Sequence, residues 1–389
     1  MKVTGGEAAC YRIRLREPWQ SANHTITVFE LITARLRTDT GQEGVGWTFT
    51  VGAGGTAIAA FLTDDLLPIA SGLDPALVER TWHTLHGTVR DAAPGGIALL
   101  ALSAIDIALW DLKAQAAGEP LYRLLGASRD RAAAYGSGIN LNLPIPDLLA
   151  QFRRWRARGF RAFKMKVGSD DPRTDLERVR AVREEIGPDA VLMLDANQKW
   201  TVADAVRRIR GFEPYDPYWI EEPLPADDVA GHARLRAQIR CPVALGENLF
   251  SAAAFNEFLR HDAVDVVQPD VARVGGITPF LKIAHLAEGH GIPTAPHLVL
   301  ELSGQLSCAI RLASMIEDLD SGNLTELEAL EEPIRTADGY FTPPARPGHG
   351  VRFNWDALAR WLPADPGPAA RAKDAPATTK SQPAGHGRG

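Results

Sequence analysis

The sequence predicts an α/β protein whose centre is a closed barrel of parallel strands. Short apolar runs of strand length end repeatedly in a charged residue. The charges that end the last five runs follow one another at steps of 23 to 27 residues, from Asp195 to His297. One strand, one helix and two short connections fill such a step. The runs are AFKMKVG, VLMLDAN, YWIEEP, VALGEN, VDVVQPD and IPTAPH.

The positions of these charges favour a barrel over an open, doubly wound sheet. A barrel of βα units carries its chemistry at the C-terminal ends of several strands. An open sheet concentrates its site at the one point where the strand order reverses. Because charged residues end strand after strand here, we expect the barrel.

Composition limits the classes of protein and partner. The chain has 389 residues, 45% of them hydrophobic and 23% charged, with a net charge of −6. It is long enough for a large core and more than one domain. Without a basic excess, neither nucleic acid nor an anionic membrane is expected as a partner. The N-terminus lacks the apolar core of a signal peptide, and no apolar run approaches the roughly 18 residues of a membrane span, so we expect a cytoplasmic protein.

The three cysteines, Cys10, Cys241 and Cys308, are scattered and include no CxxC pair. This spacing indicates neither a disulfide framework nor a thiolate metal site. We expect reduced, structural cysteines.

Residues 8–50 are predicted to form antiparallel strands. The polar segment EPWQSANHT at 17–25 is predicted to be a loop between the first two strands. It is either a solvated hairpin connection or a loop over the barrel mouth that contacts a substrate. Its candidate binding residues are Trp19, Gln20, Asn23 and His24.

Two further N-terminal segments are predicted to be structural. VGAGGTAI loosely matches a dinucleotide fingerprint, but it follows an antiparallel strand and is better interpreted as a flexible loop. Residues 95–117 are apolar nearly all round and end before Gly118, which predicts a helix buried between layers. Its Asp106 and Asp111 are expected to cap or to form ion pairs.

The barrel is predicted to begin with the strand AYGSGIN, followed by a helix at 146–158. Its last strand is predicted at 323–328, NLTELE. Residues 341–362 are rich in turn formers and are expected to return to the N-terminal domain. Residues 363–389 carry Pro, Ala, Gly and charge without periodicity, which is typical of a disordered tail.

Lys164 and Lys166 lie on one face of their strand because strand side chains alternate. Two lysines facing a barrel interior require anions nearby. A solvated strand would explain the same pair without any function. By the same alternation, Asp195 and Asn197 share a face.

Asp195, Glu221 and Glu247 end three consecutive strands, so their carboxylates can converge. Three carboxylates in contact are tolerable when a divalent cation neutralises them, and ligands that are all oxygen favour magnesium over zinc. The alternative is three unrelated capping or ion-pairing acids, against which their common register argues. Of the adjacent pair Glu221 and Glu222, spacing favours Glu221.

Asp270 and His297 end the next two strands and can form a hydrogen-bonded pair. The aspartate would fix the imidazole tautomer and stabilise its charged form, which suits acid–base work. A lone histidine would more often be structural. Glu317, in SMIEDLD, can reach the same mouth.

These motifs together resemble the mandelate racemase subgroup of the enolase superfamily. The resemblance covers about 28–361 and rests on FKMKVG, LDANQKW, WIEEP, GEN, QPDVARVGGIT and PH, in that order. It implies a modified (β/α)7β TIM-type barrel beneath an α+β capping domain formed by both chain ends. The implied boundaries are 1–128 for the cap, 129–328 for the barrel, 329–362 for the return to the cap and 363–389 for the tail.

The resemblance also implies the roles of the site residues. One magnesium ion per active site would be held by Asp195, Glu221 and Glu247. Lys166 would be one base, and His297, paired with Asp270, the other. The residues expected to assist the substrate carboxylate are Lys164, Asn197 and Glu317.

The expected reaction is abstraction of the proton α to the carboxylate of an acid sugar, followed by loss of water to give a 2-keto-3-deoxy acid. A divalent cation, a lysine and a protonated acid at the carboxylate oxygens would stabilise the developing charge. Racemisation, epimerisation or cycloisomerisation through the same enediolate is the alternative. A non-catalytic acid-sugar-binding protein is a remote one, because the set of charged residues is intact.

The polar segment at 17–25 favours a polyhydroxy substrate over an aryl one, because its side chains can exchange hydrogen bonds with sugar hydroxyls. The resemblance suggests a hexonic or hexaric acid, such as talarate or galactarate. A second substrate carboxylate is left open, since Arg16 is the nearest basic residue. We expect a homo-oligomer whose only other partner is this small molecule.

Overall fold

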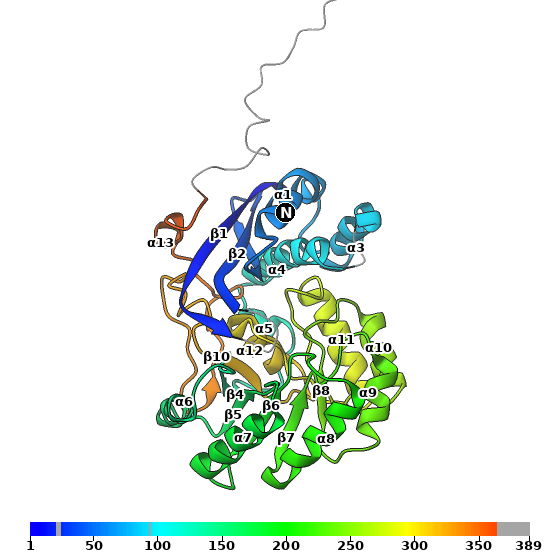
Figure 1. The fold of residues 1–389 in the computed structure, drawn as a ribbon. Helices are drawn as coiled ribbons and strands as arrows, with labels where there is room; N and C mark the ends of the chain where they lie inside the picture. Colours follow the sequence, from blue (N-terminus) through cyan, green and yellow to red (C-terminus); the bar gives the residue numbers. More distant parts are fainter. Residues whose placement is uncertain (21–24, 93–94, 364–389) are drawn as a thin grey trace, which may run out of the picture.

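The computed structural model describes residues 1–20, 25–92 and 95–363. It contains a capping domain over an α/β barrel, with the cap sheet and its helices at one end of the barrel (Figure 1). The cap sheet is antiparallel and has the order β1 (Val3–Gln20), β2 (Thr25–Thr38) and β3 (Glu43–Val51). Its shorter helices are α1 (Gly55–Phe61), α2 (Leu67–Ala70), α3 (Val78–Thr88) and α5 (Leu121–Leu124).

Helix α4 (Ile97–Ala117) is buried against β3, as its apolar sequence predicts. The close approach depends on glycines in the strand. A Cβ at Gly46 would lie 1.9 Å from the backbone oxygen of Ala104, and one at Gly44 would lie 2.5 Å from that of Ala108. Only residues without a side chain allow this packing distance.

Gly46→Ala should therefore destabilise the cap. The added methyl group meets backbone atoms of α4, which cannot rotate away, so we expect a loss on the order of 1 to 3 kcal/mol in unfolding free energy. Gly87→Ala is the matched control, because a Cβ there has open space within α3 and raises helix propensity. Urea unfolding of both variants measures the difference. Equal stability of the two would contradict the close packing of α4 on β3.

The two α4 aspartates have the structural roles that the sequence predicts. Asp106 accepts hydrogen bonds from the Thr278 backbone N–H at 2.9 Å and the Thr278 hydroxyl at 2.6 Å, and so caps α11 (Ile277–Gly289) of the barrel. Asp111 accepts from the backbone N–H groups of Val45 at 3.1 Å and His349 at 3.0 Å. The helix thus joins the cap sheet, the barrel and the returning chain.

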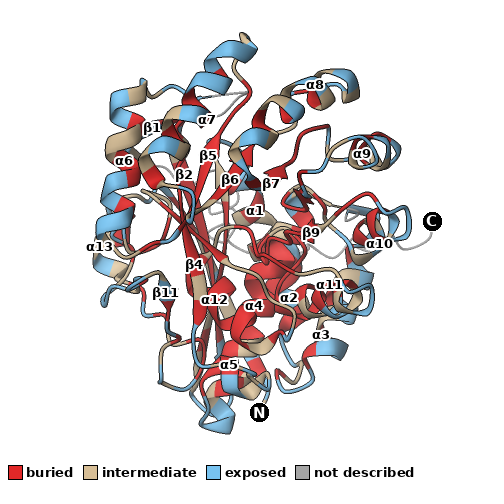
Figure 2. Ribbon diagram, turned by 90° about the horizontal axis from the view of Figure 1, so that it is seen from below, coloured by how far each residue is buried: buried red, intermediate tan, exposed pale blue. Residues whose placement is uncertain are grey.

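The barrel strands are parallel and buried, while the outer faces of the surrounding helices are exposed (Figure 2). Isolated bridges from Thr294 to Val267 and to Ala313 extend the ring beyond β9. The strands in spatial order are β10 (Ile316–Leu319), β4 (Ala132–Ser137), β5 (Ala162–Lys166), β6 (Val191–Asp195), β7 (Pro217–Glu221), β8 (Val243–Leu245) and β9 (Val266–Val267). The outer helices besides α11 are α6 (Ile145–Ala157), α7 (Pro172–Ile186), α8 (Val202–Phe212), α9 (Val229–Arg236), α10 (Ala252–Arg260) and α12 (Leu300–Ala309). The fold is thus the predicted capping domain on a TIM-type barrel.

The prediction of the last barrel strand at 323–328 was wrong. That strand is β10, and the later run folds into turns in which the N–H groups of Glu326 and Leu327 both donate to the Asn323 carbonyl at 3.1 Å. Strand β10 is short and carries two buried acids, Glu317 and Asp318. Its sequence therefore lacks the apolar run by which the other strands were predicted.

The prediction of a loop at 17–25 was also wrong for its first half. Pairing of β1 with β2 is interrupted after Arg14 and resumes at Trp19, opposite Ile26, and at Gln20, opposite Thr25. Asn23 and His24 lie outside the described residues. VGAGGTAI likewise ends in a helix, since α1 begins at Gly55.

The returning chain contacts the barrel before it reaches the cap. Strand β11 (Tyr340–Phe341) pairs antiparallel with β4, and helix α13 (Trp355–Ala359) follows. The Arg12 N–H of the cap sheet then donates to the Trp361 carbonyl at 2.9 Å. Of the predicted tail, 364–389 lies outside the described residues.

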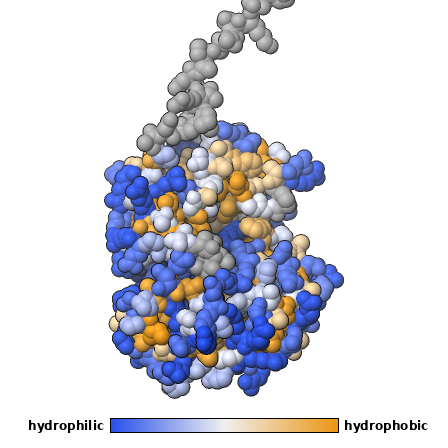
Figure 3. Space-filling view, viewed as in Figure 1, coloured by the Kyte–Doolittle hydropathy of each residue, from blue (hydrophilic) through white to orange (hydrophobic). Residues whose placement is uncertain are grey.

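The surface and the cysteines show ordinary features. Hydrophobic side chains are interspersed among hydrophilic ones on the face in Figure 3, which is typical of a protein surface. Cys10, Cys241 and Cys308 are buried and form no disulfide. Within the described part of the chain, the helices lack the length or the apolar character that a membrane crossing demands.

Candidate active site

Three carboxylates meet at the C-terminal ends of neighbouring barrel strands. Asp195 is the last residue of β6 and pairs in register with Glu221, the last residue of β7. Glu247 follows two residues after β8. One oxygen from each lies within 4.8 Å of the others, and all three residues are buried. The predicted convergence of these strand ends is present.

The electrostatics of this cluster fit a divalent cation. Burial, together with Asp195 and against the effect of Lys164, raises the pKa of Glu221 to about 8. Burial and the nearby Glu247 also raise the pKa of Glu222 well above its usual range. A magnesium ion would offset both the burial of these charges and their mutual repulsion, and oxygen ligands are those it prefers.

Glu222 is not one of the three carboxylates that converge. Its backbone has φ 39°, and its carboxylate accepts hydrogen bonds from Gln198 Nε2 at 3.0 Å and Asn248 Nδ2 at 2.9 Å. The spacing argument that selected Glu221 therefore agrees with the geometry.

Both lysines of β5 face the carboxylates from the interior of the barrel. Lys164 Nζ lies 2.8 Å from Glu221 Oε1 and 2.9 Å from Glu317 Oε1. Lys166 Nζ contacts the Asp195 carboxylate. Burial disfavours the charged amines, but these acids raise the pKa of both lysines above the ordinary value. The solvated alternative is excluded, because both lysines are buried.

His297 lies between two acids on the other side of the carboxylate cluster. Its Nδ1 is 2.8 Å from Asp270 Oδ2, and its Nε2 is 3.2 Å from Glu247 Oε2. Burial opposes protonation, but Glu247 and Asp270 raise the pKa of the imidazole above its usual value. The backbone N–H of Ala272 donates to Asp270 at 2.8 Å and fixes the carboxylate. The expected histidine–aspartate pair is therefore formed.

Glu317 closes the ring of charges from β10. It accepts hydrogen bonds from the Ser137 hydroxyl at 2.6 Å and the Leu298 N–H at 3.3 Å. Despite burial, Lys164 and His297 lower its pKa to about 2. Glu317 therefore lies beside Lys164, in a position to assist at the substrate carboxylate as expected.

The remaining predicted binding residues differ in their placement. Gln20 forms a backbone bridge with Asn140, whose side chain accepts from the Lys166 N–H at 3.0 Å, so the end of β1 reaches the barrel mouth. Asn197 lies beside the cluster, and its N–H donates to Asp195 at 2.9 Å. Trp19 is only 5% exposed and packs edge-on against Phe29, which gives it a role in the cap core.

The sequence analysis missed several residues of the mouth. Gln268 Nε2 donates to Glu221 Oε2 at 2.7 Å, and Arg273 Nη1 donates to the Glu247 carbonyl at 2.9 Å. Gln268 lies two residues before Asp270, so the alternation of that run could have placed it on the same face. Arg273 lies in the turn beyond β9, where no periodic pattern applies.

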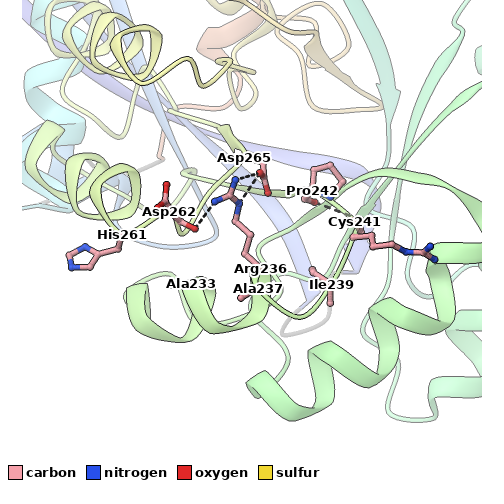
Figure 4. Close-up of a pocket in the computed structure, with 10 residues that line it drawn as sticks. Ala233, Arg236, Ala237, Ile239, Cys241, Pro242, His261, Asp262 and Asp265 are labelled. Carbon is pink, nitrogen blue, oxygen red and sulfur yellow. Dashed lines mark hydrogen bonds and ion pairs between the residues drawn. The ribbon is translucent and has the colours of Figure 1, made fainter.

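A separate hollow of about 380 Å³ lies at the opposite end of the barrel (Figure 4). It is lined by the segments that precede β8 and β9 and by the end of α9. Arg236 is paired there with Asp265 at 2.7 Å and donates to the Asp262 carbonyl at 2.8 Å. Because chemistry in this fold belongs to the C-terminal ends of the strands, the hollow is not part of the site.

Comparison with known proteins identifies the class. The family model described as mandelate racemase / muconate lactonizing enzyme, N-terminal domain, matches residues 7–126, and the one described as enolase C-terminal domain-like matches residues 147–357. The chain therefore belongs to the mandelate racemase/muconate lactonizing enzyme family of the enolase superfamily, as its motifs predicted.

Two curated relatives and one solved structure are similar to this chain over most of its length. The 3,6-anhydro-alpha-L-galactonate cycloisomerase of Streptomyces coelicolor is 39% identical over 90% of this chain and 96% of its own. The L-talarate/galactarate dehydratase of Salmonella typhimurium is 39% identical over 86% of this chain and 83% of its own. The L-talarate dehydratase of Polaromonas sp. JS666, complexed with Mg and L-glucarate, superposes with a TM-score of 0.85 at 36% identity, over 93% of this chain and 97% of that one. The chain is accordingly an enzyme of the lyase or isomerase class.

Proposed function

We propose that the protein is a magnesium-dependent acid-sugar dehydratase. The observation that carries the proposal is the arrangement of two bases about one carboxylate cluster. Lys166 contacts Asp195 at one end of the cluster, and His297 contacts Glu247 at the other. A substrate carboxylate held at the cluster would place its α-carbon between two groups able to accept or donate a proton. The magnesium-bound relative with L-glucarate supports the substrate class.

In this proposal, Asp195, Glu221 and Glu247 hold the magnesium ion. The ion, when bound, supplies positive charge at the substrate carboxylate. Lys164 provides a second positive charge next to the same oxygens, since its Nζ lies 2.8 Å from Glu221 Oε1. Both charges stabilise the negative charge that develops as the α-proton leaves.

Lys166 and His297 carry out the proton transfers. Lys166 accepts or donates a proton on one face of the α-carbon, and His297 does so on the other. For dehydration, His297 in its protonated form donates a proton to the departing β-hydroxyl, and Asp270 stabilises that protonated form through the 2.8 Å contact with Nδ1. The resulting enol takes up a proton at C3 and becomes a 2-keto-3-deoxy acid.

Cycloisomerisation is the second candidate, and the 39% identity to the anhydrogalactonate cycloisomerase favours it. In a 3,6-anhydro sugar acid, the ring oxygen at C3 occupies the β-position that a hydroxyl has in an open-chain acid. Protonation of that oxygen by the same His297 would open the ring without loss of water. The two candidates therefore differ in the leaving group and share every charged residue of the site.

A substrate panel tests the proposal. Purified protein with magnesium is incubated with mandelate, hexonic acids, the hexaric acids talarate and galactarate, and 3,6-anhydrogalactonate. Products are followed as 2-keto acid, by mass spectrometry and by change of configuration. A 2-keto acid lighter by one water is the expected product, whereas a 2-keto acid of unchanged mass would favour cycloisomerisation. Turnover of mandelate alone would overturn the acid-sugar assignment.

A further inference from the structure

Arg273 joins the ends of two barrel strands at the mouth of the site. Its Nη1 donates to the Glu247 carbonyl at 2.9 Å and to Asn248 Oδ1 at 3.1 Å. The guanidinium also lies 3.6 Å from the Glu247 carboxylate and 3.7 Å from that of Asp270. These are the two acids that contact His297 from opposite sides.

The capping domain also contacts Arg273. Its guanidinium carbon lies 5.9 Å from the ring centroid of Phe49 on β3, at a distance where a cation and an aromatic face attract. Phe49 stacks on Phe29 at 5.3 Å, and Phe29 meets Trp19 edge-on at 6.2 Å. An aromatic stack of the cap therefore ends on this arginine.

The chemistry of the side chain explains why an arginine suits this position. Its planar group presents several donors in a fixed fork and keeps its charge at every physiological pH. Here Arg273 donates hydrogen bonds to Glu247 and Asn248 after β8. It also lies beside Asp270 after β9 and packs on the ring of Phe49. A lysine would provide the charge, but its compact ammonium could not keep this set of contacts.

Arg273 also balances charge within the pair of acids. Asp270 and Glu247 both approach one imidazole, and a cation beside both acids reduces the repulsion between them. Within the described residues, the ion pairs place Arg273 next to both acids at once.

We propose that Arg273 is a positioning residue for the histidine–aspartate pair. It holds Asp270 and Glu247 in place around His297, and the aromatic ring of Phe49 on the cap fixes Arg273 in turn. The inference rests on the proposed function in so far as His297 acts as one of the two bases. Arg273 itself is not assigned a contact with the substrate.

The test compares Arg273→Gln and Arg273→Lys with His297→Asn, and uses Arg208→Gln as a matched control. Arg208 is similarly buried, lies 5.5 Å from the Trp200 ring and pairs with Asp175 at 3.2 Å, outside the site. Three quantities are measured with magnesium and the acid sugar turned over by the wild type. They are kcat and KM for product formation, and exchange of the α-proton with deuterated solvent.

Arg273→Gln should have the same kind of kinetic defect as His297→Asn, but a smaller one. We expect kcat to fall by roughly 10- to 100-fold with little change in KM, the usual effect of losing a group that orients a site residue. Arg273→Gln should slow the partial reaction that His297→Asn loses. The partial reaction that depends on Lys166 should continue. Arg273→Lys should recover part of the rate. In a further variant, Arg273→Ala, added guanidinium ion should restore part of the activity. Equal loss of both partial reactions, or kinetics like the wild type, would overturn the proposal.

A measurement without substrate separates this inference from the proposed function. A ring proton on His297 Nδ1 that is shared with Asp270 should give a downfield proton resonance, to be assigned by its disappearance in His297→Asn. Arg273→Gln should shift or broaden this resonance in the free protein, and Arg208→Gln should leave it unchanged. If the wild type turns over no acid sugar, the proposed function fails while this resonance still decides the role of Arg273. An unchanged resonance in a folded Arg273→Gln protein would contradict the positioning role of Arg273. If the glutamine variant does not fold, the same resonance is measured in Arg273→Lys.

Discussion

Glu221→Gln should abolish turnover while leaving the protein as stable as the wild type or more so. The substitution removes one of three charges that a divalent cation requires, and several kcal/mol of transition-state stabilisation correspond to a loss of at least roughly 10³-fold in kcat. The free protein should stay folded, because burial raises the pKa of Glu221 to about 8 and so already disfavours the charge that the substitution removes. The measurements are kcat with saturating magnesium, magnesium binding by calorimetry and the unfolding temperature.

Asp318→Asn is the matched control for this prediction. Asp318 is also buried on a barrel strand, but it pairs with Arg158 at 2.9 Å on the other face of β10. This variant should lose stability and retain magnesium binding. Full activity of Glu221→Gln, or of the wild type in excess chelator, would show that the three carboxylates do not hold a catalytic ion.

Lys166→Met and His297→Asn should each lower product formation by roughly 10²- to 10⁴-fold, the range for loss of a general acid or base. The two variants should differ in the partial reaction that survives, because their side chains contact opposite ends of the carboxylate cluster. The measurement is exchange of the substrate α-proton in deuterated water, followed by NMR for each variant.

The variant that still exchanges this proton has lost the group that acts later, on the β-hydroxyl. The variant that no longer exchanges it has lost the abstracting base. If both variants exchange at the wild-type rate, neither residue is the abstracting base, and the assignment of the two bases is contradicted.

Much of the fold and site could be predicted because both follow from the repeating pattern of the barrel. Asp195, Glu221 and Glu247 recur at strand ends, and the ends of parallel strands meet at one edge whatever the rest of the chain does. Lys164 and Lys166 needed only the two-residue alternation of a strand. Neither inference depends on long-range packing.

The errors have a different origin. Strand β10 carries Glu317 and Asp318, whose burial is possible only because Lys164 and Arg158 reach them from other elements. Pairing of β1 with β2 resumes at Trp19 after an irregular stretch, so a local polar pattern concealed it. Arg273 packs on Phe49 of the cap, a contact between two domains that no sequence period encodes.

The most direct test of the central claim is the fate of deuterium when the protein acts on an acid sugar in deuterated water. With magnesium present, the account predicts a 2-keto-3-deoxy acid that carries solvent deuterium at C3, because the enol takes its proton from water after the α-proton has left. Excess chelator should stop this incorporation, and Glu221→Gln should behave like the chelated enzyme. Acid sugars that bind in the presence of magnesium but show neither exchange at the α-carbon nor keto acid formation would contradict the account.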